Sequence, residues 1–313
     1  MKKSLVIIAA RGIGDLIYHL PLLRSLYENN KEKLIIISNK VNHSKEVYKY
    51  ETFYKKIIYF DNTRFSLFKT LKTIINLKNL INQFNVDELI LTGSPRRLMI
   101  PVYMSNAKEK IIFGGGKFLF NKDNKYQHLT HSEKIVKYTE SLNIKIKKDD
   151  FCLKTYPIKT NDENIEIKKI FVSLDSHHDQ NNWNINNYIK LIKKILINKV
   201  KIFINFSPTK QYFKDLLPEE IKNSEKIIFT DNKPISEIIE IINSCNFILG
   251  NESGPVCLGA SLKKEVHSIY IPIHTEPESK IINDGTFYYN AQKETEEEII
   301  NKIFNRIFKE KKF

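Results

Sequence analysis

The sequence predicts an α/β protein of two domains, each with a parallel sheet whose strands alternate with helices. The 313 residues exceed the usual size of a single hydrophobic core. In both halves, Ile- and Val-rich segments alternate with segments of helical periodicity. This periodicity weakens between 145 and 168, where Lys, Asp and Asn accumulate. We therefore expect domains over residues 1–150 and 165–313, joined by a linker.

The first strand, turn and helix are the clearest elements. Residues 4–10 are nearly all apolar, as in a strand that is buried on both faces of a parallel sheet. Gly12 and Gly14 permit a sharp turn, and leucines at helical spacing follow up to Leu26, with Pro21 predicting a bend. The turn lacks the Gly-Lys-Ser/Thr of a P-loop, and Ile17 stands where a dinucleotide fingerprint needs a third glycine. These departures argue against a P-loop nucleotidase and a Rossmann oxidoreductase.

Asp15 stands where this helix begins, and two interpretations of it remain open. It is either an N-cap whose carboxylate accepts the amides of the first turn, or a functional carboxylate. The second interpretation follows from position, because open α/β sheets bind ligands beyond the carboxyl ends of their strands. A carboxylate there can serve as a base.

The rest of the first half continues the alternation. A pair of arginines, Arg96 and Arg97, follows the strand that ends at Thr92, so the pair belongs to the same sheet edge as Asp15. Such a pair either clamps phosphates or carboxylates or is simply exposed. We expect strands at 33–38, 56–60, 86–92 and 111–113, a short helix between the first two, helices at 67–84, 98–106 and 128–143, and a glycine turn at 114–116.

The second half repeats the architecture, and two of its strand ends are rich in polar residues. Residues 175–183 contain His177, His178 and the only tryptophan; adjacent histidine side chains diverge, so we expect a polar loop and no metal. In residues 250–262, Ser253 is an N-cap with Pro255 behind it, and the free first-turn amides suit either structure or phosphate. We expect strands at 170–174, 200–206, 227–229 and 247–250, and helices at 188–196, 236–245 and 294–312.

Composition restricts location and partners. The net charge of +14 attracts anions, but the lysines are dispersed, which favours a solvated surface with weak attraction to anionic membranes over a nucleic-acid site. No apolar run approaches the roughly 20 residues needed to cross a bilayer, and the N-terminus is not a signal peptide. The three cysteines are far apart and predicted to be reduced. We expect a cytoplasmic protein, with peripheral contact at the inner face of the inner membrane.

Three motifs in matching order resemble glycosyltransferase family 9, the bacterial heptosyltransferases that extend the lipopolysaccharide core. The first is Gly14-Asp15 with Pro21 and Leu23-Arg24-Ser25-Leu26, and the second is the loop that ends at Trp183. The third is Asn251-Glu252-Ser253-Gly254-Pro255 running into Leu258-Gly259-Ala260-Ser261-Leu262. Together these motifs span most of the chain.

The resemblance implies two Rossmann-like domains facing across a cleft, the GT-B architecture. It implies an inverting transfer without metal or cofactor, which agrees with the absence of an Asp-x-Asp element. The donor is a nucleotide sugar, as ADP-heptose is in the family, and the acceptor is a glycan or glycolipid. Asp15 is then the general base, and Ser253 and Gly254 hold the diphosphate. Further donor contacts are expected from Ser176, His178, Asn181 and Glu252, and acceptor or phosphate contacts from Gly14, Arg96 and Arg97.

The chain departs from the family at three of these positions. Asn181 stands where the family often has Lys, Glu252 where it has Asp, and Cys257 where it has His. The phosphate clamp therefore lacks a cation unless His177, His178 or an arginine supplies one. A noncatalytic member that binds nucleotide or glycan without transfer is the alternative function.

Overall fold

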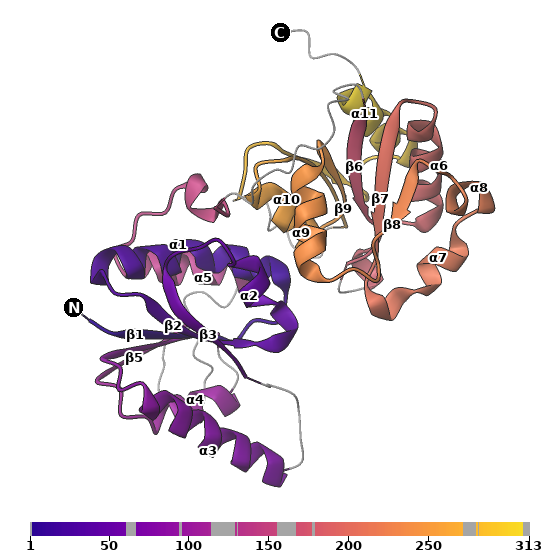
Figure 1. Cartoon of the computed structure of the whole chain (residues 1–313). Coiled ribbons are helices and arrows are strands. Elements are labelled where there is room, and N and C mark those ends of the chain that lie inside the picture. Colours follow the sequence, from indigo (N-terminus) through magenta and orange to yellow (C-terminus); the bar gives the residue numbers. More distant parts are fainter. Residues whose placement is uncertain are drawn as a thin grey trace. The chain divides into compact units, whose positions relative to one another are not determined.

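The computed structural model divides the chain into two compact units, Met1–Leu153 and Lys154–Phe313 (Figure 1). It describes residues 2–60, 67–93, 96–113, 129, 131–154, 167–176, 179–271, 280 and 282–308, with the backbone alone at 67–69, 96, 131 and 132. The expected glycine turn at 114–116 lies outside these residues. No helix among the described residues is long and apolar enough to cross a membrane.

The first unit is built on a parallel sheet whose described strands follow the order β3-β2-β1-β4-β5. Its strands are β1 (Ser4–Ile8), β2 (Leu34–Asn39), β3 (Tyr54–Phe60), β4 (Glu88–Thr92) and β5 (Glu109–Phe113). Its helices are α1 (Ile13–Asn30), α2 (Ser44–Val47), α3 (Leu67–Gln83), α4 (Arg96–Tyr103) and α5 (His131–Ser141).

Helices cover both faces of this first sheet, α1, α2 and α5 on one and α3 and α4 on the other (Figure 1). All five residues of β1 are buried, as the run of apolar residues predicts. Helix α1 continues through Pro21. The order of strands reverses between β1 and β4, and such switch points are where doubly wound sheets bind ligands.

The second unit repeats this arrangement with a further strand. The described strands form a parallel sheet in the order β11-β10-β9-β6-β7-β8, so the switch point lies between β6 and β9. The strands are β6 (Lys168–Ser173), β7 (Val200–Asn205), β8 (Ile227–Phe229), β9 (Phe247–Asn251), β10 (Glu265–Tyr270) and β11 (Thr286–Asn290). The helices are α6 (Ile185–Leu196), α7 (Tyr212–Leu216), α8 (Glu219–Lys222), α9 (Ile235–Ser244), α10 (Gly254–Ser261) and α11 (Glu296–Phe308).

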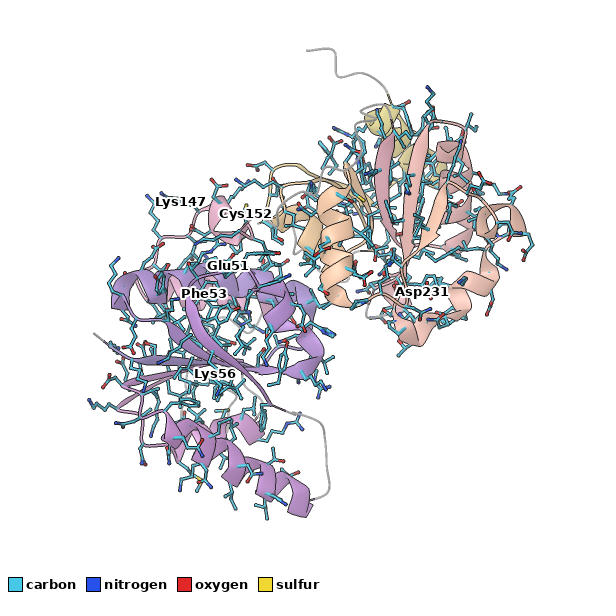
Figure 2. The ribbon with its side chains drawn as sticks, viewed as in Figure 1. Glu51, Phe53, Lys56, Lys147, Cys152 and Asp231 are labelled. Atoms are coloured by element: carbon cyan, nitrogen blue, oxygen red, sulfur yellow. The ribbon has the colours of Figure 1, made fainter. Side chains whose placement is uncertain are left out.

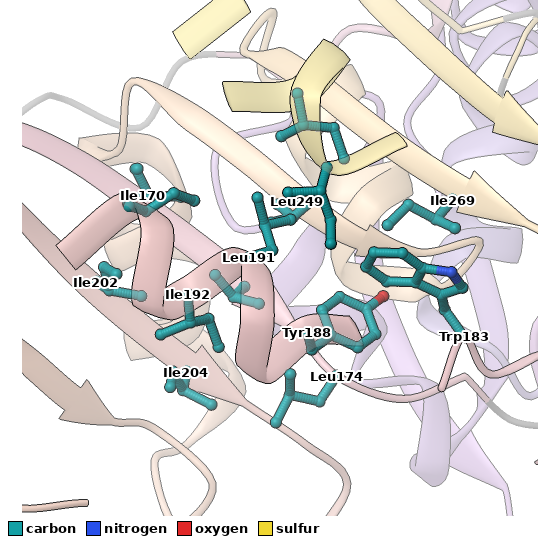
Figure 3. Close-up of a cluster of buried hydrophobic side chains, with 14 of the residues drawn as sticks. Ile170, Leu174, Trp183, Tyr188, Leu191, Ile192, Ile202, Ile204, Leu249 and Ile269 are labelled. Carbon is teal, nitrogen blue, oxygen red and sulfur yellow. The ribbon is translucent and has the colours of Figure 1, made fainter. Parts of the chain in front are cut away.

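The core of the second unit joins α6 and α11 to the sheet (Figure 3). The only tryptophan, Trp183, lies in this core, with its ring edge-on to Tyr188 at a centroid distance of 5.0 Å. On the opposite side, Gly259 of α10 lies so close to β9 that an added Cβ would be 2.7 Å from a side-chain carbon of Ile248. The small residues of α10 thus bring its N-terminus close to the end of β9.

Residues 145–153, which we expected to begin the linker, belong to the first unit. Arg24 of α1 forms a double hydrogen bond with Glu51, at 2.7 and 3.3 Å, and donates to the carbonyl oxygens of Asp150 (3.0 Å) and Cys152 (2.6 Å). The Glu51 side chain is 1% exposed, and Figure 2 labels both Glu51 and Cys152, the two residues that accept from Arg24 Nη2. This buried ion pair fixes residues 150–152 to the first unit, although the polar composition of the segment did not indicate to which domain it belongs.

A buried histidine should make the second unit sensitive to acid. His267 of β10 is fully buried among aromatic rings, donates or accepts at the Tyr289 hydroxyl (3.0 Å), and has Nε2 at 3.4 Å from the Glu265 carboxylate. Burial lowers the pKa of His267 below 6.5, although Glu265 opposes this shift; Arg306 adds to it. As the pH falls below 6.5, His267 therefore binds a proton in the unfolded chain more readily than in the folded chain.

We expect stability to be lost as pH falls through 6.5, by up to about 1.4 kcal/mol per pH unit from this residue. Urea unfolding between pH 8 and pH 5 measures the effect. His267→Gln removes the titration and should flatten the dependence, whereas a His43→Asn substitution at an exposed position should leave it unchanged. Equal slopes for wild type and His267→Gln would contradict the assignment.

Candidate functional site

Asp15 is the third residue of α1 and not its N-cap. Gly12 is the N-cap, in extended conformation, and the helix begins at Ile13. The Asp15 carboxylate turns back, and its Oδ2 accepts a hydrogen bond from the Gly12 amide at 3.0 Å. The N-cap is therefore Gly12, three positions before the one we expected, but the Asp15 carboxylate does accept an amide at this helix start, as the capping interpretation predicts. The half-buried carboxylate still lies at the carboxyl edge of β1.

A buried histidine braces this turn against the sheet. His19 Nδ1 lies 2.6 Å from the Asp15 carbonyl oxygen, and its Nε2 lies 2.7 Å from Thr92 Oγ1 at the end of β4. The Thr92 hydroxyl also lies 3.2 Å from the Ile7 carbonyl of β1. Asp15 is thus tied to both strands of the first switch point, a feature that the spacing of residues in the sequence did not reveal.

The other expected residues of the first unit lie near the same edge. Gly14 is buried in the first turn of α1. Arg96 and Arg97 are the first residues of α4, the helix that follows β4 in the chain, and β4 is the neighbour of β1. Arg97 is half-buried, and the Arg96 side chain lies outside the described residues. The topology therefore brings these positions to the edge where Asp15 lies.

In the second unit, Ser253 occupies the N-cap of α10, as the sequence predicts. Its side chain makes no capping hydrogen bond, and its hydroxyl lies 3.4 Å from the Ser173 hydroxyl at the end of β6. Gly254 is the first residue of the helix, and the first intrahelical bond runs from the Cys257 amide to the Ser253 carbonyl. The amides of this first turn, with the positive end of the helix dipole, form a site that suits an anion at the second switch point.

Asn251 connects the two polar loops that the sequence singled out. Its amide oxygen accepts from the Trp183 backbone N–H at 2.7 Å, and its Nδ2 donates to the Leu174 carbonyl at 2.8 Å. The segment after β6 is thereby fixed to the segment that precedes α10. Glu252 points to a different neighbour, since its Oε2 accepts from the Ser268 hydroxyl of β10 at 2.8 Å.

The loop after β6 is held by side chains within it. The Ser176 amide and hydroxyl both donate to Asn182 Oδ1, at 2.7 and 3.0 Å. Asn181 Oδ1 is buried without a hydrogen-bond partner in the part of the chain that the structure describes. His177 and His178 lie outside the described residues.

Lys210, which we did not single out from the sequence, supplies a cation to this loop. It follows β7 and donates to the Ser176 carbonyl at 2.8 Å and to Asp179 at 2.6 Å. Asp175, 4% exposed, accepts from the Ser207 hydroxyl and amide at 2.6 and 3.1 Å. Burial raises the pKa of Asp175, although the Ser207 bonds and Lys210 oppose the shift. The only feature of the sequence that could have pointed to Lys210 is its position shortly after the end of the strand β7.

The comparisons with known proteins identify the architecture. The chain is similar to a glycosyltransferase family 9 structure from Veillonella parvula (TM-score 0.70, 14% identity), with 93% of this chain and 86% of that chain covered. It is also similar to E. coli heptosyltransferase WaaC with ADP (TM-score 0.71, 12% identity, 97% and 98% covered). The chain has the GT-B fold.

The GT-B fold extends to other nucleotide-sugar proteins among the similar structures. UDP-GlcNAc 2-epimerase from Methanocaldococcus jannaschii, in complex with UDP-GlcNAc and UDP, gives a TM-score of 0.55 at 16% identity, with 99% of this chain and 94% of that chain covered. No family model matches the sequence, and no curated protein does. The resemblance to glycosyltransferase family 9 is thus confirmed for the GT-B fold.

Proposed function

We propose that the chain is an inverting, metal-independent glycosyltransferase that moves a sugar from a nucleotide-sugar donor to a hydroxyl of a lipopolysaccharide core or another cell-surface glycan. The observation that carries the proposal is the position of Asp15, a carboxylate fixed in the first turn of α1 at the switch point of the first sheet. The first unit would then bind the acceptor and the second the donor.

Asp15 is suited to the role of general base. An alcohol is a weak nucleophile at neutral pH, and a carboxylate that takes its proton during attack on the anomeric carbon lowers the barrier. The hydrogen bond from Gly12 and the brace through His19 hold the residue in place. Gly14, Arg96 and Arg97, at the same edge, would contact the acceptor or its phosphates.

Ser253 and Gly254 are suited to hold the donor diphosphate. The Ser253 hydroxyl is not used as a cap, so it remains available as a donor beside the first-turn amides. Ser176, His178, Asn181 and Glu252 would surround the remainder of the donor. Lys210 has a positioning role in this proposal, because it holds the loop through the Ser176 carbonyl.

The positive charge of the chain fits the expected partners and location. Phosphorylated glycolipid acceptors and the anionic inner face of the inner membrane would both attract a cytoplasmic protein of net charge +14. A nucleotide sugar would be a substrate, and no cofactor or nucleic-acid partner is part of the proposal.

A stability screen with nucleoside diphosphates and nucleotide sugars tests the proposal first. A ligand that binds only the folded chain raises the unfolding midpoint by mass action. We expect at least one of these ligands to do so, with sugar transferred to a glycan acceptor in its presence. Binding without transfer would favour the noncatalytic alternative, and no binding would contradict the donor site.

Substitutions at Gly254 locate the diphosphate. Gly254→Ala and then Gly254→Val should weaken nucleoside diphosphate binding progressively, because each added carbon obstructs approach to the first-turn amides. We expect about a tenfold loss or more for Val, with little change in unfolding midpoint. Isothermal titration calorimetry measures the affinities. Unchanged affinity in folded Gly254→Val would leave this motif with a structural role only.

A further inference from the structure

One buried carboxylate of the second unit has no role in the proposed chemistry. Asp231 follows β8 and is 6% exposed, and its Oδ2 is buried with no hydrogen-bond partner among the described residues. Figure 2 labels it at the end of β8. A buried carboxylate oxygen without a donor destabilises a fold, and none of the described residues supplies a donor to this one.

The backbone amides of the turn after β8 and the lysines that follow β7 and β8 have other partners. The turn after β8 is closed by other bonds, from the Thr230 amide to the Ile204 carbonyl at 2.9 Å and from the Lys233 amide to the Thr230 carbonyl at 3.1 Å. The Lys233 ammonium pairs with Glu237 at 2.7 Å, and the Lys210 ammonium pairs with Asp179 at 2.6 Å. Among the described residues, Asp231 Oδ2 thus remains a buried acceptor without a donor.

The sheet register places Asp231 in line with the candidate diphosphate site. Phe229 of β8 pairs with Ile204 of β7, and Ile204 pairs with Val172 of β6. The next residue of β6, Ser173, pairs with Gly250 of β9. Asp231, two residues after Phe229, is therefore at the same height along the sheet as Asn251 of β9. Asn251 comes two positions before Ser253. Three strand spacings separate β8 from β9, which is about 14 Å. An extended nucleotide is long enough to reach from a diphosphate at α10 to the end of β8.

The hydrogen-bonding chemistry of the carboxylate selects the part of the nucleotide. Ionised Asp only accepts hydrogen bonds, and its two oxygens suit two parallel donors. Guanine presents two adjacent donors, N1–H and the N2 amino group. Adenine and cytosine place an acceptor beside their amino group, and uracil flanks its single N–H with carbonyls. The ribose diol is a second pair of donors, but it lies next to the α-phosphate and not at the far end of the nucleotide.

We propose that Asp231 recognises the base of a guanine nucleotide, so that the donor is a guanosine diphosphate sugar. This inference rests on the proposed function, because it takes the diphosphate to lie at Ser253 and Gly254. Oδ2 is covered in the chain without ligand, so the turn at 231–234 shifts when the base enters. This shift is favoured because the N–H donors of guanine give the buried carboxylate oxygen the hydrogen bond that it lacks.

Asp231→Asn tests this pairing through an exchange of base preference. Wild type should bind GDP about 10- to 100-fold more tightly than ADP, UDP or xanthosine diphosphate. Asn offers one acceptor and one donor, which matches the N1–H and C2 carbonyl of xanthine. We expect the variant to lose affinity for GDP by a similar factor and to gain affinity for xanthosine diphosphate. Titration calorimetry measures all four nucleotides.

Asp215→Asn, at an exposed position of the same unit, removes the same charge and should keep wild-type affinities. Equal loss for every nucleotide in Asp231→Asn, or no gain for xanthosine diphosphate, would overturn base recognition. If nucleotides still bind and Gly254→Val still weakens them, the proposed function survives that result. If no nucleotide binds wild type, both proposals fail.

Discussion

Asp15→Asn should lower turnover by a factor of about 100 to 10,000, the range over which a positioned general base contributes. Asn has nearly the same size, and its carbonyl oxygen can still accept the hydrogen bond from the Gly12 amide. The N-terminus of α1 therefore keeps its cap while the reaction loses its proton acceptor. Steady-state sugar transfer gives kcat, and the unfolding midpoint and nucleotide affinity should stay close to wild type.

Gly12→Ala provides a second variant at the same turn. The added Cβ would lie 2.9 Å from Asp15 Oδ2, so the carboxylate has to move although its chemistry is unchanged. We expect a smaller loss of kcat than in Asp15→Asn. Near-normal turnover in a destabilised Asp15→Asn protein would mean that this carboxylate is a helix cap only. No transfer by wild type would favour the noncatalytic alternative.

Arg24→Met should destabilise the first unit by about 3–5 kcal/mol, because it leaves Glu51 buried without its cation. The Glu51 side chain is 1% exposed, and that of Arg24 17%. The substitution also removes the donors to the Asp150 and Cys152 carbonyls, so residues 148–153 lose these hydrogen bonds to α1. Urea unfolding followed by far-UV circular dichroism measures the change.

The double variant Arg24→Met with Glu51→Leu is the matched control. Replacing both charges with apolar side chains removes the uncompensated carboxylate, so much of the lost stability should return. Trp183 fluorescence reports on the second unit alone and should move less than the circular dichroism signal. A single variant as stable as wild type would show that Glu51 finds another partner.

Local sequence patterns predict much of the fold, because both periodicity and turn residues act over short distances. The apolar run of β1, Gly12 before α1 and the Ser-Gly-Pro start of α10 are found where the sequence places them, whereas Gly14 lies inside α1 and not in the turn before it. β10 was missed because its central His267 and Ser268 interrupt the apolar pattern, although both are fully buried. β11 was also missed; its apolar run is only three residues long, Phe287 to Tyr289, between Thr286 and Asn290.

The side-chain partners of the candidate site depend on contacts that no local pattern encodes. Asp15, Ser253 and Gly254 follow strand ends, so the position of the strands was enough to select them. The brace from His19 to Thr92 spans 73 residues, and the bond from Lys210 to Ser176 spans 34. Such pairs can be predicted only when the order of the strands in the sheet is known, because that order, and not the distance between the residues in the sequence, makes them neighbours.

The parallel arrangement of both sheets also has a consequence for how the chain reaches its native state. No two neighbouring strands of the described residues can be joined by a hairpin, and the central pairs bring together residues as distant as Ser4 and Glu88. The chain must therefore lose the entropy of closing long loops before strand pairing stabilises it, and this makes folding slow. The two switch points depend on these central pairs. During synthesis, the turn that carries Asp15 is finished only after β4 has left the ribosome, some seventy residues later.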